Sequence, residues 1–404
     1  MEGNFIFLTN QYLPKPGATG LCVHQLAKEL AKDNNVWTIC YKDEDDRNEF
    51  DGVKTIKINV PFFLRENNNK SNIARKSQYF GSLISKAVYF RQYPLRSRKL
   101  IKNYKKAVES IINSVGKATI VASYTPLEAV IAAKEIKDSH KDKVNIVYYS
   151  TDTLSNEQGN DGLLPAEYRT KCGIRWEKEL FAKFDKILIM ECHRAHYYTD
   201  TYKEFFRKFA IVNFPLLTRP VIQASKKEEK SKIRLVYAGT LYKQLRNPEF
   251  LLNILVELSK KIEMEAVFLG GGDCEDLLNK AEKDSNGVVK YLGMQPHDTA
   301  MQYIASADVL LSIGNVESPM APSKIYEYMA TGKPIIHTYT YEKDPCLEPL
   351  VRYGNALILK NDDNNALEKT LECIGHITIL DYEEVKCRFL TSTPLFSVDL
   401  IKEC

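Results

Sequence analysis

The sequence contains no run of about 18 apolar residues, the length from which a membrane-spanning helix is inferred. Residues 1–4 have neither the basic region nor the small-residue cleavage site of a secretory signal. We therefore expect a protein that neither spans a membrane nor is secreted, and that works in the cytoplasm.

Regularly spaced cysteine pairs are also missing. The nine cysteines are an odd number, are scattered along the chain, form no C-x-x-C pair and do not lie beside histidine at the spacing of metal ligands. We therefore expect neither a disulfide scaffold nor a zinc site, but buried or unused thiols in a reducing compartment.

Several common catalytic motifs are absent as well. The glycines at 270–272 do not form a G-x-G-x-x-G fingerprint, and neither a Walker A sequence nor a G-x-S-x-G elbow occurs. A dehydrogenase or a kinase would thus lack its phosphate loop. The acidic segment 43–46 has the D-x-D spacing that can hold a metal-bound diphosphate, but the flanking Lys42 and Arg47 favour a surface turn. No metal and no cofactor are expected.

Acidic residues are missing from one long segment. The whole chain has 56 basic and 52 acidic residues, a net charge of +4. Residues 67–108 hold eleven of the basic residues and no aspartate or glutamate, so the other 362 residues, with 45 basic against 52 acidic side chains, carry −7. This asymmetry indicates either a face for an anionic partner or a well-solvated segment.

The same segment has apolar residues at helical spacing, at positions 80, 83, 84 and 88 and less regularly at 95. Two interpretations are open. The helix could lie shallowly on an anionic bilayer at the inner face of the membrane, as a peripheral contact, or its apolar face could pack on the first domain while its lysines meet water. The aromatic residues form no recognised nucleic-acid-binding signature, so no nucleic-acid partner is expected.

Short apolar runs alternate with helical patterns along most of the chain, which predicts an α/β fold with parallel, doubly wound sheets. A charge-rich stretch at 225–232 is typical of a linker and separates two such series. We expect two Rossmann-like domains, at 1–215 and 216–375, that face each other across a cleft lined by the carboxyl ends of their strands. The predicted strands are 4–9, 36–40, 119–122, 144–149 and 186–190 in the first series and 233–238, 266–269, 288–292, 308–313, 334–337 and 356–359 in the second.

The most informative segment is 322–336. Pro322 or Ser323 can start a helix that Gly332 ends, which would put Ser323 and Lys324 at a helix N-terminus that points into the cleft. Free N–H groups, the helix dipole and the ammonium group favour a phosphate there. Glu327, one turn further, could accept hydrogen bonds from a ribose diol. An ordinary surface helix with a capping serine and an exposed glutamate would have the same spacing.

This segment resembles the signature of the GT-B glycosyltransferases, specifically the retaining family 4. Its string PSKIYEYMATGKPII is similar to the motif of that family's C-terminal domain almost residue for residue. The likeness covers nearly all of 230–375 and is weaker in the first half. Supporting strings occur in the same order: VYAGTL at 236–241 followed by Arg246, FLGGG at 268–272 and YLGM at 291–294.

The resemblance implies a nucleoside diphosphate sugar as the donor and assigns residues to its parts. Arg246 and Lys324 would meet the charge that develops on the leaving diphosphate. It also implies that a helical segment at 376–404 returns to the first domain. The family would place the ribose on Glu327, the diphosphate near Gly239, Thr240, Arg246, Ser323 and Lys324, the base beside Met294, and the backbone at Gly17 and Gly20 close to the phosphates or the acceptor.

Two positions depart from the family's common pattern. Relatives often have a carboxylate eight residues before the ribose glutamate, where this chain has Pro319, and an arginine where it has Thr240. In the first half, Ser150 and Asp152 follow a strand where relatives frequently present a histidine, and they could position the acceptor. A turn or helix cap explains Asp152 equally well.

We therefore expect a cytoplasmic glycosyltransferase that moves a hexose from a nucleoside diphosphate sugar to a hydroxyl of a glycan or lipid-linked glycan acceptor, as in polysaccharide biosynthesis. The resemblance implies retention of configuration and no metal. A sugar-nucleotide epimerase or hydrolase of the same fold, and a non-catalytic glycan- or nucleotide-binding relative, are the alternatives.

Overall fold

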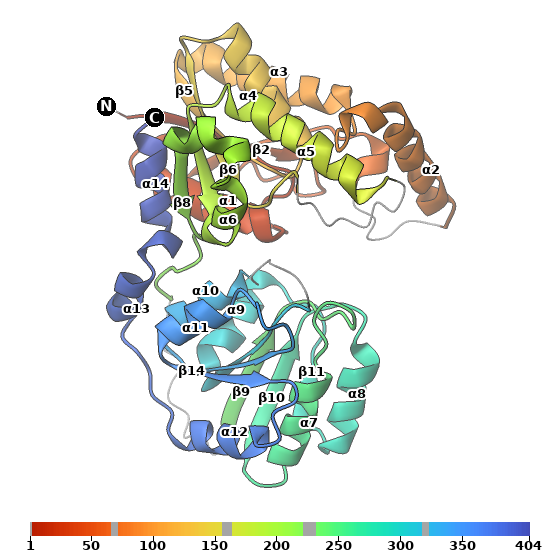
Figure 1. The fold of residues 1–404 in the computed structure, drawn as a ribbon, viewed down its shortest axis with the longest axis vertical. Coiled ribbons are helices and arrows are strands. Elements are labelled where there is room, and N and C mark those ends of the chain that lie inside the picture. The colour runs from red at the N-terminus through yellow and green to blue at the C-terminus, as the bar shows by residue number, and fades with distance from the viewer. Residues whose placement is uncertain (1, 66–71, 156–163, 221–231, 317–322) are drawn as a thin grey trace. The chain divides into compact units, whose positions relative to one another are not determined.

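The computed structural model describes residues 2–65, 72–155, 164–220, 232–316 and 323–404. It divides into two compact units, one made of Met1–Pro215 and Pro394–Cys404 and the other of Leu216–Thr393 (Figure 1). Residues 225–231 of the expected linker lie outside the described residues. Within the described part, no helix is both long and apolar enough to cross a membrane.

The first unit is built on an eight-stranded sheet with the order β3-β4-β2-β1-β5-β6-β7-β8. All neighbouring strands are parallel except the short β3, which pairs antiparallel with β4. The five predicted strands are confirmed, and β3, β4 and β8 were not predicted. The strands are β1 (Asn4–Leu8), β2 (Asn35–Tyr41), β3 (Glu49–Phe50), β4 (Val53–Ile58), β5 (Ala118–Ser123), β6 (Val144–Ser150), β7 (Lys186–Met190) and β8 (Phe209–Val212).

Helices pack on this sheet and bury its apolar side chains. Ile6, Ile120, Ile146 and Ile189, from four adjacent strands, are fully buried in one cluster with the apolar sides of α3 and α4. Burial of such a side chain contributes about 1.5 to 3 kcal/mol to folding. The helices of this unit are α1 (Ala18–Leu30), α2 (Asn72–Val88), α3 (Arg98–Val115), α4 (Leu127–Ser139), α5 (Ala166–Phe181), α6 (Arg194–Tyr197) and α14 (Pro394–Lys402).

Helix α2 forms where the segment without acidic residues predicted an apolar helical face. That face does not pack on the first unit: the side chains of Phe80, Ile84 and Val88 are 65%, 51% and 65% exposed. The interpretation of a face packed on the domain is therefore wrong for these residues. Leu95 is buried, but it lies after the helix has ended.

The second unit has a six-stranded, fully parallel sheet with the order β11-β10-β9-β12-β13-β14. All six predicted strands are confirmed. This is a Rossmann order, in which the first and fourth strands of the unit, β9 and β12, lie side by side at the switch point. The strands are β9 (Ile233–Ala238), β10 (Met264–Leu269), β11 (Val289–Tyr291), β12 (Val309–Ile313), β13 (Ile335–Tyr339) and β14 (Ala356–Lys360).

Helices lie on both faces of this sheet (Figure 1). Leu255 and Leu258 of α7 are fully buried against Leu235 and Phe268 of the central strands. The helices of this unit are α7 (Glu249–Leu258), α8 (Glu275–Asp284), α9 (His297–Ser306), α10 (Lys324–Ala330), α11 (Leu347–Tyr353), α12 (Ala366–Gly375) and α13 (Tyr382–Arg388).

The end of the chain differs from the expectation that all of 376–404 returns to the first domain. Only Pro394–Cys404 belongs to the first unit, where Lys186 donates to the carbonyl oxygen of Leu400 at 2.8 Å. Helix α13 stays in the second unit because it packs there: Phe389 lies edge-on to Tyr326 of α10, and Arg388 donates to the carbonyl oxygen of Tyr353.

The glycine at 272 offers a test of the second unit's packing. Its φ is +133°, and a Cβ atom there would lie 1.7 Å from the carbonyl oxygen of Leu241. Because alanine would both strain the backbone and displace that strand end, we expect Gly272→Ala to lower the free energy of unfolding by about 3 kcal/mol in urea denaturation. Gly375→Ala, where a Cβ meets nothing within 4 Å, should stay within about 1 kcal/mol of the parent. Equal stabilities of the two variants would contradict this account.

Candidate active site

The seven candidate residues of the second unit lie around the carboxyl ends of its parallel strands, and Arg246 is the most firmly held of them. Nε and Nη2 of its guanidinium both donate to Oδ1 of Asn315, at 3.0 and 2.7 Å, and Nη1 donates to the carbonyl oxygen of Thr240 at 3.2 Å. Gly239 and Thr240 follow β9, and Asn315 follows β12. The arginine therefore bridges the two strands of the switch point, where ligands bind in such sheets.

Two glycines let the chain after β10 lie against the residues after β9 that contact Arg246. Gly270 and Gly272, after β10, have φ values of +146° and +133°, and a Cβ on Gly270 would lie 1.8 Å from the carbonyl oxygen of Gly239. The nitrogen of Leu241 donates to the carbonyl oxygen of Gly271 at 2.9 Å. Only glycine permits both the backbone angle and the close approach. The result is a direct contact between two stretches of peptide backbone, one after β9 and one after β10.

Met294 borders this glycine segment. Its side chain is 69% exposed, and its Cε atom would be 3.2 Å from a Cβ on Gly271. The nitrogen of Gly270 also donates to the carbonyl oxygen of Gly293 at 2.9 Å. Met294 is thus an exposed apolar side chain at the edge of the glycine segment.

Helix α10 supplies the charged pair of the site. Nζ of Lys324 donates to Oε2 of Glu327 at 2.7 Å, and the Glu327 side chain is only 7% exposed. The helix is tied to the end of β9 because the nitrogen of Ala238 donates to Oη of Tyr328 at 2.7 Å. The alternative of an exposed surface glutamate is therefore wrong. Ser323 precedes the helix, but its side chain accepts no capping hydrogen bond.

His297, at the start of α9, is a neighbour of this pair that the sequence did not predict. Burial holds the pKa of the His297 imidazole below its usual value, and the nearby Glu327 carboxylate opposes this shift. The imidazole is therefore mostly neutral near pH 7 and can accept a hydrogen bond. Asn315 was missed as well, although it holds Arg246.

In the first unit, Gly17 and Gly20 have an internal role. A Cβ on Gly17 would lie 2.3 Å from Oε1 of Gln11, and one on Gly20 would lie 2.3 Å from the carbonyl oxygen of Gln11. The two glycines therefore let the loop after β1 fold onto the start of α1. Their expected approach to a ligand stays a prediction.

Ser150 is the last residue of β6 and Asp152 follows the strand, but of the two only Asp152 is partly exposed. Ser150 is fully buried, and its Oγ atom lies 2.9 Å from the carbonyl oxygen of Asp152 and 3.2 Å from Oη of Tyr197. A direct contact between Ser150 and an acceptor would require this network to open. Asp152 is thus the more accessible of the two predicted acceptor residues.

A buried carboxylate fixes the loop that follows. Glu177 of α5 accepts from the nitrogen of Leu154 at 2.9 Å and from the hydroxyls of Tyr197 and Tyr202. Burial raises the pKa of the Glu177 carboxyl, while these hydrogen bonds lower it. Nε2 of His196 lies 2.8 Å from Oγ of Ser155 in the same loop. The loop at the end of β6 is therefore held at several points.

The acidic turn after β2 behaves as expected for a surface turn. Asp43 pairs with Lys57, and Asp45 pairs with Arg47, at 2.6 and 2.9 Å. The hydrogen bonds from Arg47 lower the pKa of the Asp45 carboxyl to about 2. The two aspartates at the D-x-D spacing thus already have cationic partners. Pro319, the position where relatives often carry a carboxylate, lies outside the described residues.

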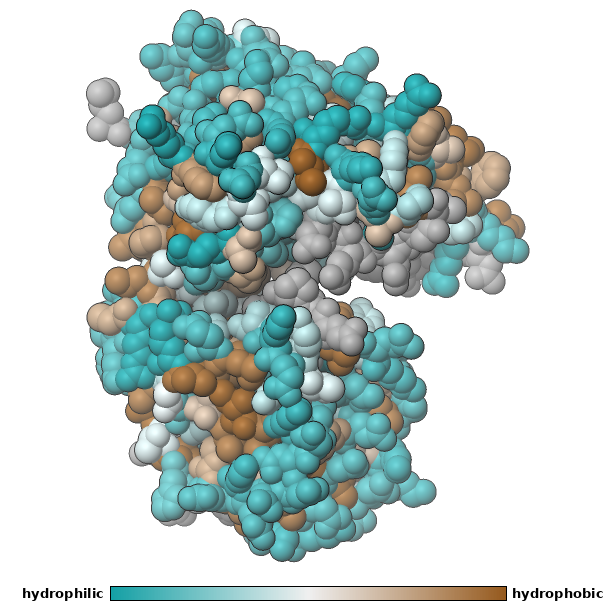
Figure 2. Space-filling view, in the orientation of Figure 1, coloured by the Kyte–Doolittle hydropathy of each residue, from teal (hydrophilic) through white to brown (hydrophobic). Residues whose placement is uncertain are grey.

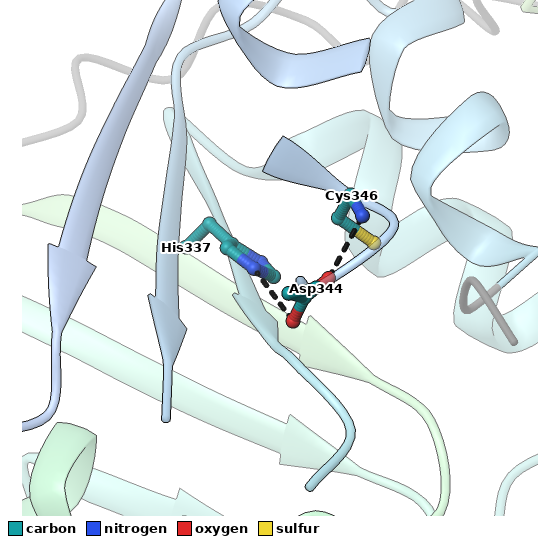
Figure 3. Close-up of side chains that lie close together, drawn as sticks. All are labelled: His337, Asp344 and Cys346. Atoms are coloured by element: carbon teal, nitrogen blue, oxygen red, sulfur yellow. Dashed lines mark hydrogen bonds and ion pairs between the residues drawn. The ribbon is translucent and has the colours of Figure 1, made fainter. Parts of the chain in front are cut away.

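Three buried side chains lie close together near Asn315, although their spacing in the sequence is not that of a common metal-binding motif. His337 of β13 and Asp344 and Cys346 of the following loop point toward one another, and their candidate ligand atoms all lie within 4.8 Å (Figure 3). Asp344 accepts from the nitrogen of Cys346 at 2.8 Å, and burial raises the pKa of the Cys346 thiol well above its usual value.

This cluster explains a further glycine and fits a structural role. A Cβ on Gly314 would lie 1.8 Å from Oδ2 of Asp344. Among the described residues the cluster has three candidate ligands, fewer than the four of a structural zinc site. It thus fixes the loop after β13 against the end of β12, next to Asn315.

Comparison with known proteins identifies the second unit. Residues 232–374 match the family model described as glycosyl transferases group 1. Curated protein sequences show no match to the chain.

Several solved structures share the whole fold. HepE from Anabaena, described in complex with UDP and glucose, matches with a TM-score of 0.59 at 14% identity, covering 100% of this chain and 99% of its own. Sucrose-phosphate synthase from Thermosynechococcus elongatus matches with a TM-score of 0.57 at 14% identity, covering 99% of this chain and 95% of its own. WaaG, a glycosyltransferase involved in lipopolysaccharide biosynthesis, matches with a TM-score of 0.54 at 13% identity, covering 98% of this chain and 99% of its own. The chain thus has the GT-B fold with two Rossmann-like units, and residues 232–374 of its second unit are similar to the group 1 glycosyl transferases.

The proximity of His297 to Glu327 can be measured by titration. We expect the NMR titration midpoint of His297 to lie below 6.5, and Glu327→Gln to lower it further because the carboxylate favours the imidazolium. As the folded pKa lies below the unfolded one, the unfolding free energy should fall as the pH drops through that midpoint. Glu368→Gln, on the distant helix α12, should leave the midpoint unchanged. The same midpoint in both variants would show that Glu327 does not face His297.

Proposed function

We propose that the chain transfers a hexose from a nucleoside diphosphate sugar to a hydroxyl of a glycan or lipid-linked glycan, in the cytoplasm. One observation carries the proposal: Arg246 is clamped at the switch point while Lys324 and Glu327 form a pair on α10, next to the same strand ends. Two cations beside exposed peptide groups suit a diphosphate. The presence of UDP and glucose in HepE, of the same fold, supports this donor class.

Each side chain has a task in this reaction. Cleavage of the glycosyl–phosphate bond leaves negative charge on the diphosphate, and the guanidinium of Arg246 and the ammonium of Lys324 stabilise it. Because Asn315 already fixes Arg246, the arginine needs little reorganisation as the charge develops. Glu327 accepts hydrogen bonds from the ribose, and Gly239, Thr240 and the Ser323 turn provide backbone groups for the phosphates. Met294 covers the base.

The acceptor would use the first unit. Asp152 is the partly exposed carboxylate there, at the end of β6 on a loop that Glu177 holds in place. Such an aspartate can orient an acceptor hydroxyl. Retention of the anomeric configuration and independence of a metal are parts of the proposal that rest on the resemblance to retaining family 4.

Binding of nucleoside diphosphates tests the donor assignment. We expect Glu327→Gln to weaken the tightest-binding nucleoside diphosphate about 10- to 150-fold in calorimetry, about 1.5 to 3 kcal/mol, since it loses a charge-assisted hydrogen bond to the ribose. Glu368→Gln, an exposed glutamate of the same unit, should bind as the parent does, and both variants should melt normally. Unchanged affinity of Glu327→Gln, or no binding of any nucleoside diphosphate by the parent, would overturn the assignment.

Chelation tests the role of the cations. We expect transfer, or slow donor hydrolysis, to persist in excess EDTA because Arg246 and Lys324 supply the charge that a divalent ion would otherwise provide. Loss of activity with EDTA and its return with manganese would contradict this, and would direct attention to His337, Asp344 and Cys346. Donor hydrolysis without transfer to any glycan acceptor would favour the hydrolase alternative.

A further inference from the structure

Helix α2 has its apolar side turned away from the protein. Gln78, Ser82 and Ser85 face inward: Gln78 donates to the carbonyl oxygen of Arg65, and Ser85 donates to the carbonyl oxygen of Arg96 at 2.6 Å. Arg96 in turn donates to Oγ of Ser82 at 2.6 Å. The side that packs on the first unit is therefore small and polar.

The opposite side of the helix is apolar and exposed. Because 3.6 residues make one turn, positions 73, 80, 84 and 88 fall on the side away from 78, 82 and 85. All four are more than half exposed, and so is Tyr79 at their edge. Figure 2 shows apolar side chains gathered at the end of the first unit that carries α2 in Figure 1. An apolar side of this extent on a soluble surface marks an interaction site.

The helix is held in this orientation by close packing. A Cβ on Gly81 would lie 2.7 Å from the ring of Phe62, so the glycine lets the helix sit directly on the Phe62–Leu64 turn. The bonds of Arg96 to Ser82 and Ser85 add a polar anchor. A rotation that buried the apolar side would break these contacts, so the exposure of Phe80 and Ile84 is built into the fold.

The charges around this surface define its partner. Arg75 and Lys76 lie on α2 and are exposed, and the guanidinium of Arg91 lies 5.6 Å from the ring of the half-exposed Phe90. No acidic residue occurs between 67 and 108. Glu167, beside the Tyr168 that donates to the carbonyl oxygen of Phe90, is paired with Lys171 at 2.7 Å.

We infer that α2 binds the surface of an anionic lipid bilayer, with Phe80, Ile84 and Val88 among the acyl chains and Arg75, Lys76 and Arg91 at the headgroups. Within the described part of α2 and the turn after it, the exposed apolar side chains are bordered by basic ones, which is typical of helices that lie in such an interface. Pairing of two copies through α2 is disfavoured because it would bring like charges together. The inference deepens the proposed function, since it would bring the first unit to an acceptor carried by a lipid.

Co-sedimentation with vesicles tests the inference without donor or acceptor. We expect the full chain to bind vesicles of phosphatidylcholine mixed with phosphatidylglycerol, to bind phosphatidylcholine alone at least tenfold more weakly, and to be released as salt rises. Phe80→Gln/Ile84→Gln should lower the partition coefficient at least tenfold. The matched control is Val351→Gln/Ile379→Gln, which changes two exposed apolar residues of the second unit and should bind as the parent does.

The charges are tested in the same assay. Arg75→Gln/Lys76→Gln/Arg91→Gln should lower binding to anionic vesicles about a hundredfold, about fivefold or 1 kcal/mol for each charge. Lys261→Gln/Lys280→Gln/Lys283→Gln, which removes three exposed lysines of the second unit, should have a much smaller effect. Arg96 is left unchanged because it anchors α2.

Three outcomes would overturn the inference. They are equal binding to neutral and anionic vesicles, no binding to either, and a concentration-dependent dimer in sedimentation that Phe80→Gln/Ile84→Gln abolishes. Melting curves confirm that each variant is folded. Nucleoside diphosphate affinity, measured without vesicles, reports on the second unit separately, so failure of the membrane contact and failure of the donor site can be told apart.

Discussion

The direct contact between two stretches of peptide backbone controls the geometry of the proposed donor site. Gly270 and Gly272 allow the chain after β10 to lie directly on Gly239–Leu241 after β9. This contact fixes the carbonyl oxygen of Thr240, which receives Arg246, and Asn315 then holds the guanidinium from the other side of the switch point. A side chain at either glycine would separate the strand ends and misplace the cation. The position of the Arg246 guanidinium thus depends on Gly270 and Gly272, two residues without side chains.

Much of this arrangement could be predicted from the sequence. Parallel strands that are buried on both faces appear as uninterrupted apolar runs, which is why all the strands of the second unit were found. Arg246, Lys324 and Glu327 were proposed as site residues from a family motif, and the structure adds that Lys324 and Glu327 are hydrogen-bonded to each other. The two short strands β3 and β8 were missed because runs of two and four residues carry no periodicity.

Other features could not be predicted, for physical reasons. Asn315 lies in a loop and His297 at the start of α9. Each is a single polar residue whose role depends on neighbours that are distant in the sequence. Ser150 was expected to face a substrate, but the period of a strand does not say which of its sides is covered, and in the structure its hydroxyl faces Tyr197. The apolar pattern of α2 was correctly identified. Whether such a face meets protein or something else is not contained in the pattern.

The position of α14 has a consequence for how the chain is made. The second unit is one continuous stretch, Leu216–Thr393, inserted into the first unit, and the eleven residues that follow it contain α14, the last helix of the first unit. On a ribosome the second unit can therefore fold as soon as its own residues have emerged, since domains generally fold as units during synthesis. The first unit, although most of it precedes the second in the sequence, cannot cover the side of α1 that meets α14 until Pro394–Lys402 has been synthesised. The domain that is started first is thus the one that is finished last.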